Sequence, residues 1–177
     1  MQKQYSILTQ AGCRFCGAKL HHTFVDLGMS PLCESYVDVD RLNQMEPFYP
    51  LHVYVCDSCF LVQLEEYVNP AEIFSEYAYF SSYSDDWLKH AKNYVEMIIR
   101  RANLNSLSKV IELGSNDGYL LQYFVQKGFS ALGIEPAANV ATAAEKIGVP
   151  TVVKFFNRKT AQELSAQYGR ADLLIGN

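Results

Sequence analysis

From residue 106 onward, short apolar runs alternate with amphipathic stretches. The apolar runs predict strands at Lys109–Leu113, Ala131–Ile134, Thr151–Val153 and Asp172–Ile175. Apolar spacings of three and four between them predict helices over Tyr119–Gln126, Ala137–Ile147 and Lys159–Tyr168. Such alternation indicates right-handed βαβ units and an α/β fold built on a parallel sheet. Because the last strand is followed by no covering helix, we expect the sheet to be incomplete.

A long amphipathic helix is predicted before this segment. Ser84 is suited to cap its first turn, where Asp85 and Asp86 favour the helix dipole, and Arg100 and Arg101 do the same at its end. One apolar stripe follows the helical period and consists of Trp87, Leu88, Ala91, Tyr94, Val95, Ile98, Ile99 and Ala102. One face of this helix is therefore expected to be buried.

Closer to the N-terminus, two β-type runs, Leu51–Val55 and Phe60–Leu64, flank the sequence CDSC. They predict a hairpin with a metal knuckle at its turn. We therefore expect a small zinc-binding lobe over residues 1–70, an aromatic linker and long helix over 71–105, and an α/β domain over 106–177.

Four cysteines are arranged as two CxxC pairs, and this spacing is typical of a zinc site. Cys13 and Cys16 form the first pair, and Cys56 and Cys59 form the second. Four thiolates complete a tetrahedral shell and leave no position for water or substrate, so the predicted zinc is structural.

Other interpretations of these residues remain open. The pairs could be buried thiols or a redox motif, and His21, His22 or His52 could replace a cysteine as a ligand. Cys33 is expected to be a small buried hydrophobic residue, with a nucleophile or a fifth ligand as the alternative.

Composition narrows the class of protein. The chain is 49% hydrophobic, which indicates a globular protein, and it has neither a run of about 20 apolar residues nor a signal-peptide pattern at its start. Its default location is therefore the cytoplasm, where thiols stay reduced. The first 66 residues carry four basic and eight acidic side chains, which argues against a nucleic-acid partner.

A glycine-rich loop follows the first predicted strand of the α/β segment. The sequence IELGSNDGYL places a set of candidate residues at the mouth of a helix: Glu112, Gly114, Asn116, Asp117 and Gly118. Open α/β sheets bind nucleotides at this position, beyond the carboxyl ends of their strands. The two glycines allow a sharp turn and a close approach to a ligand.

Glu135 ends the second strand, where a carboxylate can accept hydrogen bonds from both hydroxyls of a ribose. A dinucleotide site requires GxGxxG for its pyrophosphate, but Asn116 replaces the second glycine and Asp117 would repel phosphate. S-adenosylmethionine fits, because it carries adenine, ribose and a positive sulfonium. The alternatives are a glycine turn that only packs, a nicotinamide or flavin site, and Glu135 as a surface charge.

The order of these motifs resembles the S-adenosylmethionine-dependent C-methyltransferases of nucleotide-linked deoxysugars, which have an N-terminal zinc-binding domain. The resemblance rests on CRFC, CDSC, LGMSPLCESY, EYAYFSSYS, IELGSNDGYL, GIEP and DLLIGN. It implies the first half of a class I methyltransferase sheet with strand order 3-2-1-4. That order would bring Gly176 and Asn177 opposite Gly114, so Asn177 joins the predicted cofactor site.

Further roles follow only from this resemblance. Tyr77, Tyr79 and Ser82 would face a nucleoside-diphosphate keto-sugar, although the aromatic residues could instead only cover the sheet. The family's catalytic base, a histidine well after the glycine loop, has no counterpart here, so we expect the 177 residues alone to be inactive. The alternative function is a non-catalytic zinc-stabilised module that binds a cofactor or a protein through the exposed edge of its fourth strand.

Overall fold

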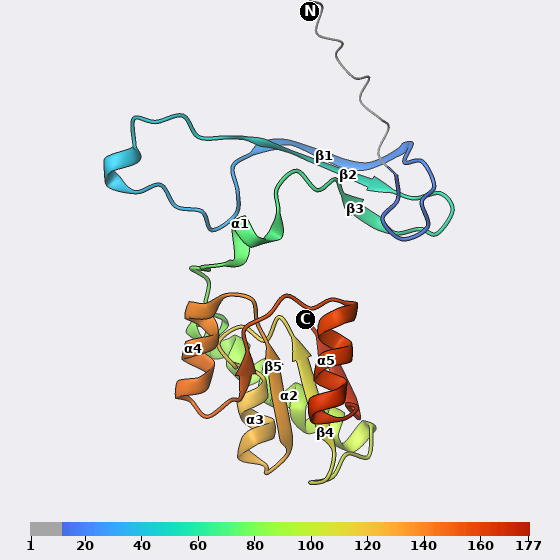
Figure 1. The fold of residues 1–177 in the computed structure, drawn as a ribbon, viewed down its shortest axis with the longest axis vertical. Coiled ribbons are helices and arrows are strands. Elements are labelled where there is room, and N and C mark those ends of the chain that lie inside the picture. Colours follow the sequence, from blue (N-terminus) through green and yellow to red (C-terminus); the bar gives the residue numbers. More distant parts are fainter. Residues whose placement is uncertain (1–11) are drawn as a thin grey trace, which may run out of the picture. The chain divides into compact units, whose positions relative to one another are not determined.

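The computed structural model describes residues 12–177, so the first eleven residues of the predicted 1–70 lobe lie outside the description. The chain divides into two compact units, which meet in sequence between Pro70 and Ala71 (Figure 1). Within residues 12–177, no helix has the length and apolar character needed to cross a membrane.

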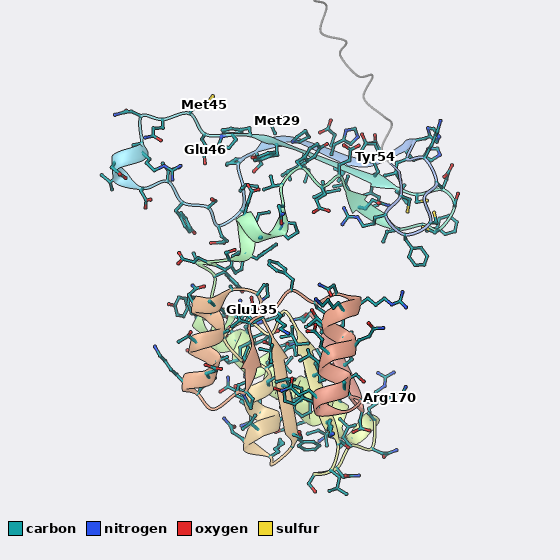
Figure 2. All side chains as sticks on the ribbon, viewed as in Figure 1. Met29, Met45, Glu46, Tyr54, Glu135 and Arg170 are labelled. Carbon is teal, nitrogen blue, oxygen red and sulfur yellow. The ribbon has the colours of Figure 1, made fainter. Side chains whose placement is uncertain are left out.

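The N-terminal unit is built on an antiparallel sheet of three strands in the order β1-β2-β3. Its strands are β1 (His22–Ser30), β2 (Tyr49–Val55) and β3 (Val62–Leu64), with the 3-10 helix η1 (Val39–Arg41) in the β1–β2 connection. The predicted hairpin around CDSC is confirmed, because Val55 pairs with Val62. In Figure 2, Met45 and Glu46 lie on the long β1–β2 connection.

Strand β1 was not predicted from the sequence, because its pairing register with β2 is interrupted twice. The pairing with β2 shifts between Thr23 and Val25 and again between Asp26 and Met29. At the second irregularity Gly28 adopts a φ of +78°, and its N–H donates to Asp26 Oδ1 over 2.9 Å. These bulges disrupt the period-two alternation by which a strand is recognised in a sequence.

The C-terminal unit contains a parallel sheet with the order β6-β5-β4-β7. Its strands are β4 (Lys109–Leu113), β5 (Ser130–Ile134), β6 (Thr151–Val152) and β7 (Leu173–Gly176). In order of appearance along the chain this is 3-2-1-4, so the α/β fold and the strand order expected from the sequence are confirmed. Consequently the carboxyl ends of β4, β5 and β7 lie at one edge of the sheet.

The predicted helices are present, with ends that differ by one or two residues. They are α2 (Asp85–Arg101), α3 (Leu121–Gln126), α4 (Ala138–Lys146) and α5 (Arg158–Tyr168). Two short helices, α1 (Pro70–Phe74) and η2 (Ser81–Tyr83), were not predicted. Ser84 caps α2 as predicted, since its Oγ accepts from the Trp87 N–H over 3.2 Å. One core joins Val95 of α2 and Phe124 of α3 to Val110 of β4.

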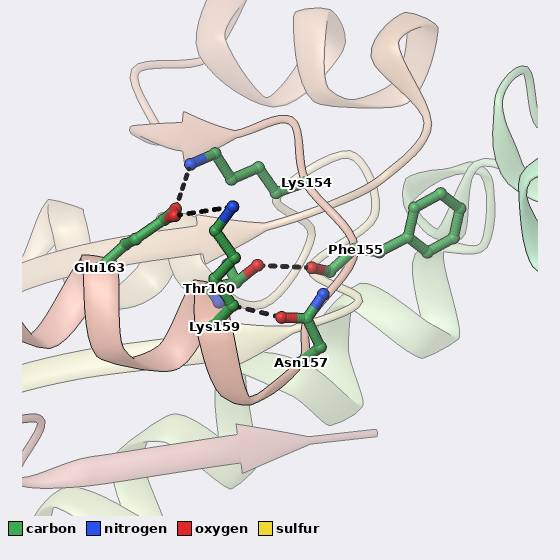
Figure 3. Close-up of polar contacts among 6 residues, drawn as sticks. All are labelled: Lys154, Phe155, Asn157, Lys159, Thr160 and Glu163. Carbon is green, nitrogen blue, oxygen red and sulfur yellow. Dashed lines mark hydrogen bonds and ion pairs between the residues drawn. The ribbon is translucent and has the colours of Figure 1, made fainter.

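A polar network fixes the connection from β6 to α5 (Figure 3). Asn157 caps α5 by accepting from the Thr160 N–H over 3.0 Å, and the Thr160 hydroxyl donates to the carbonyl of Phe155 over 3.0 Å. Lys154 forms an ion pair with Glu163 over 2.8 Å. The chain leaving the carboxyl end of β6 is thus held to the first two turns of α5.

Candidate functional site

The four cysteines of the N-terminal unit converge on one point. Their Sγ atoms all lie within 4.8 Å of one another, with Cys13 and Cys59 3.6 Å apart and Cys16 and Cys56 also 3.6 Å apart. Zn–S bonds of about 2.3 Å in a tetrahedron require S–S separations of about 3.8 Å. The cluster therefore fits a zinc ion with four thiolate ligands.

The two CxxC segments have the same backbone geometry. In the first, the Gly17 N–H donates to the Cys13 carbonyl, and in the second the Phe60 N–H donates to the Cys56 carbonyl, both over 2.9 Å. The donors adopt left-handed φ values of +77° for Gly17 and +62° for Phe60. Phe60 is an unusual side chain for this conformation, which non-glycine residues rarely adopt. Each pair of cysteines is thus held by a matching turn, and the sequence alone showed only the spacing.

Gln63 of β3 binds the first CxxC segment. Its Nε2 donates to Cys13 Sγ over 3.2 Å, and its Oε1 accepts from the Arg14 N–H over 3.0 Å. Hydrogen bonds from the backbone of Cys16 and from Gln63 lower the pKa of Cys13 to about 6. Burial and hydrogen bonds from the other three cysteines instead raise the pKa of Cys59 to about 12, so the four thiols share protons unevenly and a metal would have to displace them.

The alternative ligands lie outside this cluster. Among the His, Cys, Asp and Glu side chains of residues 12–177, the four cysteines form the one group of three or more whose ligand atoms are close enough to share an ion. His52 instead contacts Thr23 Oγ1 over 2.7 Å and stacks on Tyr54. The expectation that Cys33 is buried is wrong: it is exposed, because it lies in the irregular connection after β1.

In the C-terminal unit, the glycine loop joins β4 to α3 and contains three residues with left-handed backbone. Gly114, Asn116 and Gly118 have φ values of +64°, +48° and +78°. A Cβ on Gly114 would meet no atom within 4 Å, so a ligand can approach its backbone. A Cβ on Gly118 would lie 3.0 Å from Val149 Cγ2, so this glycine is needed for packing.

Glu135 lies at the end of β5, directly beside this loop (Figure 2). Its Oε2 accepts from the Asn116 N–H and its Oε1 accepts from the Ala137 N–H, each over 2.9 Å. The side chain is 6% exposed, and a carboxylate with two oxygens can accept further hydrogen bonds. The loop and the neighbouring strand therefore hold this carboxylate in one orientation.

Two more acidic side chains are buried near the same loop. Glu112 on β4 is 0% exposed, and burial together with the charge of Glu135 raises its pKa to about 8. Asp117 is also buried, and its Oδ1 has no hydrogen-bond partner. None of these three carboxylates forms an ion pair with a basic side chain of residues 12–177. Such a site favours a cation and disfavours a phosphate.

Residues 77–83, which we call the strap, are bound to the α/β unit and are not a free linker. At one end, Asn139 of α4 accepts from the Tyr77 N–H over 3.1 Å and donates to the Tyr77 carbonyl over 2.7 Å. Tyr79 is 48% exposed. The sequence suggested no role for Asn139, since no local pattern marks a contact across 62 residues.

The glycine loop binds the middle of the strap. Asn116 Oδ1 accepts from the Ser81 N–H over 2.9 Å, and Asn116 Nδ2 donates to the Tyr79 carbonyl over 3.1 Å. Asp117 Oδ2 accepts from the Ser82 N–H over 3.1 Å. The side chains of Asn116 and Asp117, predicted to contact the cofactor, thus bind the segment that carries the predicted substrate residues.

Beside the loop, a cavity of about 200 Å³ opens among α2, the start of α3 and the end of β7. Asn177 lies here, and its Nδ2 donates to the hydroxyl of Tyr119 over 2.6 Å. Trp87 stacks on His90 and on Tyr119 in the same cavity. The strand order brings Asn177 next to the glycine loop, because Gly176 pairs with Leu113. The sequence analysis did not predict this aromatic lining, because it assigned Trp87 to the buried stripe of the long helix.

Comparisons with known proteins were consistent with these two units. Residues 13–74 match a family model described as "Putative zinc binding domain". The chain is 31% identical over 164 residues to the C-methyltransferase NovU of Streptomyces niveus, and the match covers 93% of this chain and 39% of that protein. The chain therefore spans about two fifths of the length of this relative.

Two solved structures match parts of the chain at low similarity. A SAM-dependent methyltransferase from Archaeoglobus fulgidus matches with 16% identity and a TM-score of 0.30, over 42% of this chain and 33% of that one. YjhP from E. coli matches with 16% identity and a TM-score of 0.30, over 58% and 34%.

The family model and the similarity to NovU confirm the coarser resemblance, to a C-methyltransferase with an N-terminal zinc-binding domain. Prediction of zinc as a cofactor is confirmed by the four-cysteine cluster together with the zinc-binding family model. The N-terminal unit is a zinc-binding lobe.

Proposed function

We propose that this chain is the zinc-binding and cofactor-binding part of an S-adenosylmethionine-dependent C-methyltransferase. The observation that carries the proposal is the set of buried carboxylates around the glycine loop, Glu112, Asp117 and Glu135, with no basic partner among the described residues. A ligand that carries positive charge and no phosphate fits this set. The similarity to a C-methyltransferase over 93% of the chain supports the same assignment.

Gly114 of the loop and Glu135 after β5 would bind different parts of the cofactor. Gly114 would let the backbone approach the amino-acid tail, since no atom lies where its Cβ would stand. Glu135 would accept hydrogen bonds from the ribose, and its orientation is already set by the Asn116 and Ala137 N–H groups. Asn177 lines the neighbouring cavity, and Gly118, which packs against Val149, would shape the loop and not contact the cofactor. When bound, S-adenosylmethionine supplies an electrophilic methyl group.

For the substrate, we propose a nucleoside-diphosphate-linked deoxy keto-sugar, as the family resemblance implies. Tyr77, Tyr79 and Ser82 belong to the strap, which the loop and α4 hold beside the proposed cofactor site. A base must remove a proton next to the keto group. The four histidines of the sequence all precede the glycine loop, so the proposal assigns the base to none of them and expects binding without turnover from these 177 residues.

The zinc has no part in the chemistry in this proposal. Four thiolates complete its coordination, so its contribution is to fold the N-terminal lobe. Nucleic acid is not an expected partner, because the first 66 residues have an acidic balance, and we propose a cytoplasmic location.

Isothermal calorimetry of the purified chain with S-adenosylmethionine, on a sample of measured zinc content, tests the function. We expect one zinc and one bound cofactor per chain. Zinc without cofactor binding would refute the cofactor assignment. If such a sample also showed a concentration-dependent mass, the alternative module would gain support, since β7 pairs only with β4 among the described strands and its Leu174 is exposed.

A further inference from the structure

The cavity beside the glycine loop has an aromatic wall to which the proposed function gives no role. Trp87 of α2 stacks on His90, with ring centroids 5.2 Å apart, and on Tyr119, with ring centroids 6.1 Å apart. The planes of these two rings are inclined to that of Trp87 by 15° and 23°. Trp87 is 36% exposed, so part of the wall is accessible to a ligand.

The size and the charge of the cavity limit what it can hold. Its volume is about 200 Å³, which is less than the roughly 300–1,000 Å³ of sites for drug-sized ligands. Among the described residues that line it, there is no Lys, Arg, Asp or Glu. A diphosphate would therefore lack the cationic partners that it prefers. The cavity suits a single uncharged ring and not a whole nucleotide.

Tyr119 provides a hydrogen-bond donor inside this cavity. The side chain is 3% exposed, and its hydroxyl accepts from Asn177 Nδ2 over 2.6 Å. A phenol can donate while it accepts, so the proton of Tyr119 is available to an acceptor such as a keto oxygen. Burial raises the pKa of Tyr119, which keeps this proton in place at neutral pH.

The cavity also lies next to the loop that is proposed to bind the cofactor. Asn177 lines the cavity and follows Gly176, which pairs with Leu113, the residue before Gly114. Neighbouring strands are about 4.8 Å apart. In a nucleotide-linked sugar, the sugar is the group that must approach the cofactor, and two phosphates separate it from the base. The position of the cavity therefore favours the sugar over the base as its occupant.

We propose that this cavity binds the sugar ring of the substrate, with Trp87 and His90 packing against its C–H face and the Tyr119 hydroxyl donating to its keto oxygen. This inference rests on the proposed function and adds a sugar subsite to it. An aromatic wall with a few placed polar groups is the usual composition of such a site. The diphosphate and the base remain outside the cavity.

Calorimetry with two ligands that differ by the sugar tests the subsite. Thymidine diphosphate-4-keto-6-deoxyglucose and thymidine diphosphate are each titrated into the zinc-loaded chain in the presence of S-adenosylhomocysteine, and the uridine counterparts of both are run in parallel. We expect the sugar to increase the affinity by about tenfold. The fluorescence of Trp87, the one tryptophan of the sequence, should change with the keto-sugar ligand and not with the diphosphate.

A Tyr119→Phe variant keeps the ring and removes the hydroxyl. It should lose about tenfold in affinity for the keto-sugar ligand, whereas its affinity for the diphosphate should stay the same. Tyr168→Phe is the matched control, because Tyr168 is a half-buried tyrosine of α5 outside the cavity, and it should bind both ligands like the wild type. The wild-type titrations decide the question even if Tyr119→Phe does not fold.

Equal affinity for the keto-sugar ligand and the diphosphate, with unchanged Trp87 fluorescence, would overturn the inference. An equal change of fluorescence with the diphosphate alone would also overturn it, by placing the nucleotide in the cavity. If S-adenosylhomocysteine binds and no nucleotide ligand does, the sugar subsite fails and the cofactor assignment stands. If S-adenosylhomocysteine does not bind, the proposed function itself fails, whatever the sugar does.

Discussion

Replacing Asn116 should release the strap from the glycine loop while the sheet stays intact. Two variants separate the loss of side-chain hydrogen bonds from backbone strain. Glycine tolerates the left-handed backbone at φ +48° in Asn116→Gly, and alanine does not in Asn116→Ala. Both remove the side-chain bonds to the Ser81 N–H and the Tyr79 carbonyl. Both keep the backbone N–H that donates to Glu135.

The expected loss of stability follows from those contacts. Ser81 is buried, so its N–H would be left without a partner at a cost of about 1–3 kcal/mol, which applies to either variant. Alanine in a left-handed conformation adds roughly 1–2 kcal/mol. We therefore expect about 1–3 kcal/mol for Asn116→Gly and about 2–5 kcal/mol for Asn116→Ala.

Urea unfolding followed by the fluorescence of Trp87, the one tryptophan of the sequence, measures these losses in the C-terminal unit. Hydrogen exchange should show faster exchange of the Ser81 amide in both variants. Asn103→Ala is the matched control, because Asn103 has a φ of +50° at the end of α2 and lies outside the strap. If Asn116→Gly kept wild-type stability and the Ser81 amide exchanged at its original rate, the proposed attachment of the strap would be refuted.

Three other outcomes are expected. Cys56→Ser should lose zinc and unfold the N-terminal lobe, whereas Cys33→Ser should keep one zinc per chain; metal analysis and circular dichroism decide this. Glu135→Ala should weaken binding of S-adenosylhomocysteine by about 1.5–3 kcal/mol in calorimetry, and unchanged affinity would contradict the ribose assignment. Gly133→Ala should cost about 1–3 kcal/mol in urea unfolding, because its Cβ would lie 2.3 Å from Ser115 Oγ. A second change, Ser115→Gly, should restore part of that loss.

Local patterns in the sequence were sufficient for the framework of both units. The parallel α/β arrangement and the grouping of the four cysteines were predicted correctly, since alternation of strands with helices and the CxxC spacing are properties of short segments. The strand order 3-2-1-4 was implied by the family resemblance and not by these local patterns. Ser84 was likewise recognised as a cap, because the cap and its partner Trp87 are three residues apart.

The tertiary structure alone decided what the polar side chains of the loop do. Asn116 and Asp117 bind backbone groups 35 residues earlier in the chain, and no spacing in the sequence encodes that contact. The unpaired state of Glu112 also depends on neighbours from two other strands, Gly133 and Ile175, which the sheet brings beside it. A sequence shows which groups can donate, accept or ionise, whereas burial and long-range pairing determine which of them are satisfied and which remain available to a ligand.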